Sequence, residues 1–311
     1  MPSTTVAIAD LQERIGLSRA EVRLYTSFLG LERVPRVEDM TALEMMLTVG
    51  ETVLDGVDRT RVRHLVHPHT VLHVAPATHR LMTTLRDKLR LPEASGFELT
   101  HQHCTSGLFA LRVIEALLRT ERPGAQALVL VTDRITTSLV QRLPGTTVFG
   151  EAAVAVLAGL DGPGDEVLGQ AHRTLGEYHL SLDMPPDVQR RYKLAYMPTM
   201  LEVLHEAVAD AGLTLDDVDR ILPHNVNMHS WVMAAKTLGV PVERFYLENV
   251  PKTGHCFCAD PFVNLHTARA ESAVAPGDVV AMLSAGSSGT FSAVLVRVDD
   301  LPGAPDPGGD S

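Results

Sequence analysis

The chain has 311 residues, of which 45% are hydrophobic, and its formal net charge is −11 at neutral pH. A chain of this length can bury a large core and can form two domains. The acidic charge argues against a nucleic-acid partner, because nucleic-acid binders present a basic surface. No apolar stretch approaches the roughly 20 residues that cross a bilayer, and the first residues lack the features of a secretory signal. Since the three cysteines cannot all pair, we expect reduced thiols in a cytoplasmic protein without a membrane partner.

In the first half of the chain, apolar runs and helical spacing predict alternating strands and helices. Asp10 is expected to cap the helix that follows the first strand. The run at 127–132 is unbroken and apolar, which is typical of a strand that is buried on both faces. The expected strands cover 5–9, 62–67, 97–100, 127–132 and 149–159, and the expected helices cover 41–53, 78–89 and 105–119.

The second half repeats this rhythm and therefore predicts an α/β fold with largely buried sheets. A glycine turn at 285–289 joins the last two strands. Residues 302–311 are poor in apolar side chains, and we expect them to form a flexible tail. The expected helices cover 198–211 and 228–238, and the expected strands cover 220–223, 279–284 and 291–298.

Cys104 lies in a short polar turn that opens an amphipathic helix. The unpaired N–H groups and the dipole of a helix N-terminus favour a thiolate, so this cysteine is a candidate nucleophile. Downstream, His224 follows a predicted strand and His255 lies in Lys-Thr-Gly-His-Cys-Phe-Cys. A cysteine and two histidines are the parts that acyl-thioester chemistry needs. Two alternatives are an inert buried thiol and a zinc site of Cys104 with His101 and His103, although the following helix would turn the cysteine away from such a site.

The order of these motifs resembles the β-ketoacyl-acyl-carrier-protein synthase III family of the thiolase-like superfamily. Residues 210–227 are similar to the family's "AGL…PHQAN" segment, and residues 235–255 to its "AKxLGxP…KYGN" segment. The resemblance implies a five-layer αβαβα sandwich made of two similar halves, which usually forms a homodimer. Residues 1–165 would carry Cys104 and residues 166–301 would carry His224 and His255, with the site where the halves meet.

The resemblance also implies roles for single residues. The Cys104 thiolate would attack an acyl thioester, keep the acyl group and release the carrier thiol. His224 would donate a hydrogen bond to a thioester oxygen and stabilise an enolate. The backbone N–H groups of Cys104 and Ser288 would form the oxyanion hole. Asn227 and Ala75 would line the substrate pocket, where the small Ala75 would leave room for an acyl group bulkier than acetyl.

His255 departs from the family pattern, because the initiating synthases carry asparagine at this position. Histidine titrates near neutral pH and can act as a general base, which asparagine cannot do. Our first expectation is decarboxylative Claisen condensation with a malonyl-type unit, in specialised polyketide or fatty-acid-derived biosynthesis. The alternatives are acyl transfer to a hydroxyl or an amine that His255 deprotonates, and a non-catalytic ketosynthase-like partner subunit.

Further departures concern the acyl donor. The tryptophan and arginine with which the family binds pantetheine are missing from 25–31, so the family's mode of coenzyme A binding is not supported. His229 replaces a docking arginine, but Lys236 is kept, and we expect an acyl carrier protein or another acyl-thioester donor as partner. No cofactor and no metal are expected, because the histidines of 64–73 would fall on both faces of an extended segment as surface or interface residues. Cys256 and Cys258 are interpreted as packing thiols.

Overall fold

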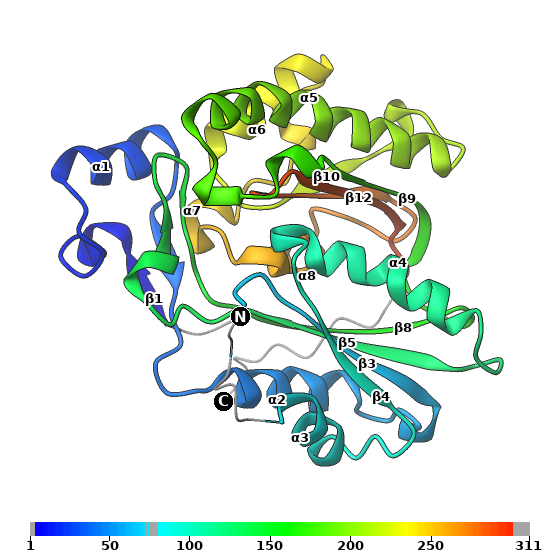
Figure 1. Ribbon diagram of the computed structural model, residues 1–311. Coiled ribbons are helices and arrows are strands. Elements are labelled where there is room, and N and C mark those ends of the chain that lie inside the picture. The colour runs from blue at the N-terminus through cyan, green and yellow to red at the C-terminus, as the bar shows by residue number, and fades with distance from the viewer. Residues whose placement is uncertain (1–3, 73, 75–79, 301–311) are drawn as a thin grey trace.

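Two four-stranded sheets and the helices around them form five layers in the order α, β, α, β, α (Figure 1). The structure is a computed structural model, and it describes residues 4–72, 74 and 80–300. The layers confirm the αβαβα sandwich that the sequence motifs implied. Ala75 and the tail at 302–311 lie outside the described residues. Within the described part of the chain, no helix is long and apolar enough to cross a membrane.

The first sheet has the strand order β4-β3-β5-β8. Strand β3 runs parallel to β4 and β5, and β8 is antiparallel to β5. The outer face is covered by helices α2 and α3, and a capping box between Thr41 and Glu44 starts α2. The elements are β3 (Val62–Pro68), β4 (Ser95–Leu99), β5 (Gln126–Thr132), β8 (Ala153–Gly159), α2 (Ala42–Val53) and α3 (Leu81–Lys88).

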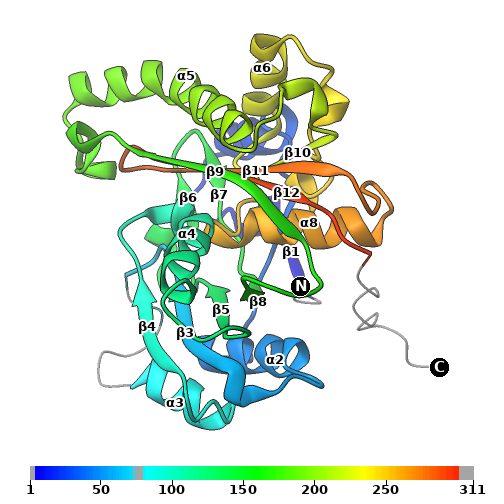
Figure 2. The same ribbon diagram turned by 90° about the vertical axis from the view of Figure 1, so that its right-hand side faces the viewer.

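The second sheet has the order β10-β11-β12-β9, with β10 parallel to β11 and the other pairs antiparallel. Helices α5 and α6 cover its outer face, and α4 and α8 fill the layer between the two sheets (Figure 2). Helices α4 and α8 are thus enclosed by both sheets. The elements are β9 (Glu166–Thr174), β10 (Arg220–Pro223), β11 (Val279–Gly286), β12 (Thr290–Arg297), α4 (Ser106–Leu118), α5 (Pro186–Asp210), α6 (Met228–Leu238) and α8 (Asp260–Ala270).

The remaining elements are short and lie beside the second sheet's layers. The chain start packs against that sheet's core, since Ile8 and Leu31 share one apolar cluster with Trp231. A small hairpin of β6 and β7 is tied to this region by the Tyr25 hydroxyl, which donates to the Leu143 carbonyl at 3.3 Å. These elements are β1 (Thr5–Ala7), β2 (Arg33–Pro35), α1 (Arg19–Arg23), β6 (Arg142–Leu143), β7 (Thr147–Val148) and α7 (Val250–Thr253).

The structure corrects several predicted elements. Asp10 does not cap a helix, because it lies inside a 3-10 turn (Ile8–Leu11) whose N-cap is Ala7. Helix α5 begins at Pro186 rather than at Pro198, which lies inside the helix. A proline inside a helix removes one backbone hydrogen bond and crowds the carbonyl of the preceding turn, but α5 continues through Pro198. Strand β9 and helix α8 were not predicted, and α8 has no polar face to reveal it because most of its residues are buried.

The histidine-rich segment is not at the surface of this chain. His64, His67 and His69 are 9%, 0% and 2% exposed, because they lie on or next to the interior strand β3. The surface interpretation of these three residues is therefore wrong, while His73 lies outside the described residues.

Candidate active site

Cys104 lies in a 3-10 turn (His103–Thr105) that leads directly into α4. His101 and His103 have φ angles of 68° and 50°, a left-handed conformation that is costly for residues other than glycine. Such strain is held only where the surroundings enforce it, and it is common at functional sites. Ser284 on β11 holds the adjacent Cys104 from the other half of the chain, since its hydroxyl donates to the Cys104 carbonyl at 2.6 Å.

Gly107 lets the start of α4 approach the segment that follows His255 in the chain. A Cβ atom at this position would lie 2.6 Å from the Cys258 carbonyl and 2.9 Å from the Phe262 ring. No side chain fits in this space, so glycine is required for the close contact.

His255 reaches Cys104 because its backbone is held on both sides. The His255 N–H donates to the Val148 carbonyl at 3.1 Å, and the His255 carbonyl accepts from Gly150 N–H at 3.0 Å. Its ring packs against Phe149, with the centroids 5.0 Å apart. In this position, His255 Nε2 lies 3.2 Å from Cys104 Sγ, although the two residues are 151 positions apart.

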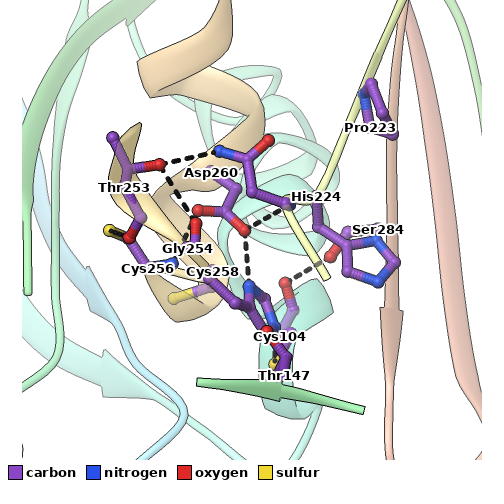
Figure 3. Close-up of polar contacts among 12 residues, drawn as sticks. Cys104, Thr147, Pro223, His224, Thr253, Gly254, Cys256, Cys258, Asp260 and Ser284 are labelled. Carbon is purple, nitrogen blue, oxygen red and sulfur yellow. Dashed lines mark hydrogen bonds and ion pairs between the residues drawn. The ribbon is translucent and has the colours of Figure 1, made fainter. Parts of the chain in front are cut away.

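Asp260, the first residue of α8, completes a triad (Figure 3). Its Oδ2 pairs with His255 Nδ1 and accepts Asn225 N–H at 2.6 Å, and its Oδ1 accepts Cys256 N–H at 2.7 Å. The carboxylate is fully buried. Sequence reasoning missed this residue. The available signal was an Asp-Pro pair, typical of a helix start, five residues after His255.

The triad changes the electrostatics of His255. Burial lowers the pKa of His255, but the negative charges of Cys104 and Asp260 on either side outweigh burial and raise it to about 10. The imidazolium is therefore stabilised between the sulfur and the carboxylate. This is the arrangement that prepares a thiol for nucleophilic attack.

His224 lies beside the triad at the end of β10. Its ring centroid is 5.3 Å from that of His255, and its carbonyl accepts from Trp231 Nε1 at 2.9 Å. Burial lowers the pKa of His224 well below its usual range, and the charge of His255 adds to this effect, so the ring stays neutral. The structure thus brings together Cys104, His224 and His255, as the sequence predicted.

The Tyr196 hydroxyl lies 3.0 Å from His224 Nε2. Burial raises the pKa of Tyr196 well above its usual value, and charges at Tyr192 and Cys104 add to this effect, so the hydroxyl keeps its proton. A neutral imidazole accepts at one nitrogen, and the protonated tyrosine supplies the donor. Tyr192, one helical turn before Tyr196 on α5, donates its hydroxyl to the Gly286 carbonyl at 2.8 Å. Neither tyrosine was predicted, because both lie in the part of α5 that precedes Pro198.

The structure also shows where three other predicted site residues lie. Ser288 lies in the turn between β11 and β12, which packs on the nucleophile turn, since a Cβ on Gly286 would lie 2.8 Å from His103 Cβ. Asn227 caps α6 by accepting Ser230 N–H at 2.8 Å. Lys236 is exposed on α6. Their predicted roles in the oxyanion hole, the pocket and carrier docking remain predictions.

The other thiols are packed, and the zinc alternative finds no support. Among the described residues, His101, His103 and Cys104 do not gather into a group that could hold a metal. Cys256 and Cys258 are 2% and 0% exposed, and burial raises the pKa of both thiols well above the usual range.

Solved structures with similar folds define the fold class. "ChlB3 [Aceyltransferase]" has a TM-score of 0.86 at 22% identity, over 98% of this chain and 96% of that one. Solved 3-oxoacyl-[acyl-carrier-protein] synthase III structures, such as that from Aquifex aeolicus, superimpose with a TM-score of 0.77. The fold is therefore that of the thiolase-like enzymes.

The sequence matches point to one family. The family described as 3-oxoacyl-[acyl-carrier-protein] synthase III C terminal matches residues 208–298. The β-ketoacyl-[acyl-carrier-protein] synthase III of Rhizorhabdus wittichii is 28% identical over 62% of this chain and 65% of its own length. That of Rhodospirillum rubrum is 26% identical over 96% of both chains. Together with the fold, these matches support a member of the β-ketoacyl-acyl-carrier-protein synthase III-like family, as the motifs indicated.

Proposed function

We propose that this chain is an acyltransferase that holds an acyl group as a thioester on Cys104 and passes it to a hydroxyl or an amine. The observation that carries the proposal is the position of His255, with Nε2 3.2 Å from Cys104 Sγ and Nδ1 paired with Asp260. An imidazole between a nucleophile and a carboxylate can move a proton to and from the reacting groups.

In the first step, the Cys104 sulfur attacks the carbonyl carbon of a donor thioester. A new C–S bond forms to Cys104, the C–S bond to the carrier breaks, and the leaving thiolate takes the proton from His255 Nε2. The triad favours this step because the imidazolium is already stabilised by Asp260, and His255 has its pKa raised to about 10.

In the second step, acylation itself turns His255 into a base. The thioester carries no charge on sulfur, so the larger of the two attractions that raised the pKa of His255 disappears, while burial continues to lower this pKa. The neutral imidazole then takes a proton from a hydroxyl or an amine as this group attacks the thioester. A C–O or C–N bond forms, the C–S bond breaks, and the proton returns to the sulfur.

The surroundings of His255 favour this reaction over decarboxylative condensation. Asp260 pairs with His255 Nδ1 and so supports the imidazole as a proton acceptor, a role that the asparagine of the initiating synthases cannot fill. At His224, Nε2 faces the Tyr196 hydroxyl at 3.0 Å, and among the described residues Nδ1 has no hydrogen-bond partner, so this ring can serve either reaction. The similarity to a structure named as an acyltransferase supports the same choice.

The donor we propose is an acyl group on an acidic carrier protein, as the names of the relatives suggest. Lys236 on α6 offers a cation beside two exposed apolar side chains, Val232 and Met233, each 43% exposed. A homodimer and a role in specialised biosynthesis remain part of the proposal.

Intact-mass measurement tests the function directly. The protein is mixed with a panel of acyl thioesters on N-acetylcysteamine and on a carrier protein, and then with hydroxyl, amine or malonyl-carrier acceptors. We expect an acyl adduct that is absent in Cys104→Ser, persists in Cys256→Ser and leaves to a hydroxyl or an amine without carbon dioxide. Carbon dioxide with a β-keto product would replace the proposal by condensation. No adduct with any donor would favour a non-catalytic partner subunit.

A further inference from the structure

The turn that joins β11 to β12, called here the glycine turn (residues 286–289), packs on the segment just before Cys104. The Thr290 hydroxyl donates to the Gln102 carbonyl at 2.9 Å. A Cβ atom on Gly286 would lie 2.9 Å from the same carbonyl, so the two segments leave no room for a side chain between them. A movement of the glycine turn would therefore change what the nucleophile faces.

Three further hydrogen bonds tie the glycine turn to residues 175–192, which include the first turns of α5. Two of them use side chains and one uses the backbone. They join the Tyr192 hydroxyl to the Gly286 carbonyl at 2.8 Å, Ser181 Oγ to Ser287 Oγ at 2.6 Å, and the Leu175 N–H to the Gly289 carbonyl at 2.8 Å. The glycine turn is thus held by elements from both halves of the chain.

Tyr192 provides a rigid donor among these contacts. Burial raises the pKa of Tyr192 above its usual value, so its hydroxyl keeps the proton that it donates to Gly286. Its ring packs between two other tyrosines, with centroids 5.1 Å from that of Tyr178 and 5.8 Å from that of Tyr196. Because a tyrosine has few side-chain torsions to fix, the packed ring holds the Gly286 carbonyl in one place.

Ser288, within the glycine turn, has unused hydrogen-bonding groups. Ser288 is 6% exposed, and its hydroxyl has no partner among the described residues. Over the described ranges 4–72, 74 and 80–300, the Ser288 N–H also donates to no backbone carbonyl. A buried N–H without a partner is rare. Free N–H groups of this kind are what an oxyanion hole offers to a reacting carbonyl.

We infer that Tyr192 is a positioning residue for the acylation of Cys104, whose hydroxyl holds the glycine turn so that the Ser288 N–H meets the developing oxyanion. The inference rests on the proposed function, in which the Cys104 sulfur attacks an acyl carbonyl. As the new C–S bond forms, the electron pair of the carbonyl bond moves to oxygen, and it returns when the leaving group departs. A donor that is already in place stabilises this charge without reorganisation.

An activated ester tests the inference without the natural donor. p-Nitrophenyl butyrate acylates Cys104 and releases p-nitrophenolate, and stopped-flow absorbance gives the maximal burst rate and the half-saturating ester concentration. Tyr192→Phe keeps the ring and removes the hydroxyl. Tyr178→Phe is the matched control, because this ring packs on Tyr192 and, among the described residues, its hydroxyl makes no hydrogen bond to the glycine turn. Cys104→Ser defines the background.

Iodoacetamide separates positioning of the glycine turn from damage to the thiol. It alkylates the same sulfur by displacing iodide from a saturated carbon, so no oxyanion forms. We expect Tyr192→Phe to lower the maximal burst rate about three- to thirtyfold, which is less than the roughly 10²–10³ lost with a whole oxyanion-hole donor. The half-saturating concentration and the alkylation rate should stay within about twofold, because neither depends on charge in the transition state. Tyr178→Phe should match the unchanged protein throughout.

Each of the following results would overturn the inference. An unchanged burst rate in Tyr192→Phe, or no burst in the unchanged protein, would remove the effect itself. A raised half-saturating concentration at constant rate would make Tyr192 a contact of the acyl donor, and an equal fall in alkylation would make it a support of the thiol. The same loss in Tyr178→Phe would assign the effect to ring packing. The burst needs no hydroxyl or amine acceptor, so these results are separate from a failure of the proposed acceptor chemistry.

Discussion

Replacing Asp260 by asparagine tests the triad with the smallest change in shape. Asp260 pairs with His255 Nδ1 and also accepts two backbone N–H groups, at 2.6 and 2.7 Å. The asparagine amide would keep one acceptor but turn an N–H₂ group toward a donor. A hydrogen bond to a charged group is worth about 1.5–3 kcal/mol, so we expect a loss of about 2–3 kcal/mol in the free energy of unfolding.

Asp260→Asn should also make Cys104 less reactive, because it changes the protonation of His255. Without the carboxylate, one of the attractions that raise its pKa to about 10 disappears, and burial lowers the pKa. The imidazolium is then no longer favoured beside the sulfur, and the tautomer is no longer selected. The same substitution in a serine protease triad lowers kcat by about 10⁴. Since a cysteine is intrinsically more nucleophilic than a serine, we expect a loss of about 10² in the rate at Cys104.

This rate can be measured without a natural substrate. Iodoacetamide alkylates Cys104, and intact-mass spectrometry follows the reaction at several pH values. Asp216→Asn, at an exposed aspartate, is the matched control and should react like the unchanged protein. Cys104→Ser defines the background from the other thiols. If folded Asp260→Asn reacts within about threefold of the unchanged protein at every pH, the carboxylate does not act through His255 and the triad interpretation is refuted.

Three further predictions concern the surroundings of the triad. Gly107→Ala would place a Cβ 2.6 Å from a carbonyl, so we expect a loss of about 1–3 kcal/mol in denaturant unfolding, whereas Gly176→Ala, with no atom within 4 Å, should be neutral. Burial raises the pKa of Asp133 from 3.8 to about 7, so its protonated form stabilises the fold at low pH, and this contribution is lost as the pH rises toward 7. Asp133→Asn should therefore gain in thermal midpoint relative to the unchanged protein between pH 5 and pH 8, and a constant difference would contradict this. Tyr196→Phe removes the hydroxyl 3.0 Å from His224 Nε2, and the loss of about 0.5–1.5 kcal/mol predicts about two- to twelvefold slower acyl release. Equal single-turnover release would show that this hydroxyl does not assist the second step.

Local sequence patterns were sufficient for most of the fold. Strand β5 is an apolar run that only a sheet covered on both faces can bury, and α4 shows the spacing of an amphipathic helix. The motifs around Cys104, His224 and His255 also identified the family and three members of the site. Where patterns were weak, as in α8, the prediction failed because burial on most sides leaves no periodic contrast.

The sequence by itself determined which groups could react, since a helix-start cysteine and two histidines after strands are visible as local patterns. Only the tertiary structure decided how they act. The charges of Cys104 and Asp260 raise the pKa of His255, whereas burial and the charge of His255 lower the pKa of His224. These differences depend on burial and on charges a few ångströms away, which arise when α5, α8 and the two sheets pack together. No local pattern carries them, because the partner atoms come from separate elements of the chain.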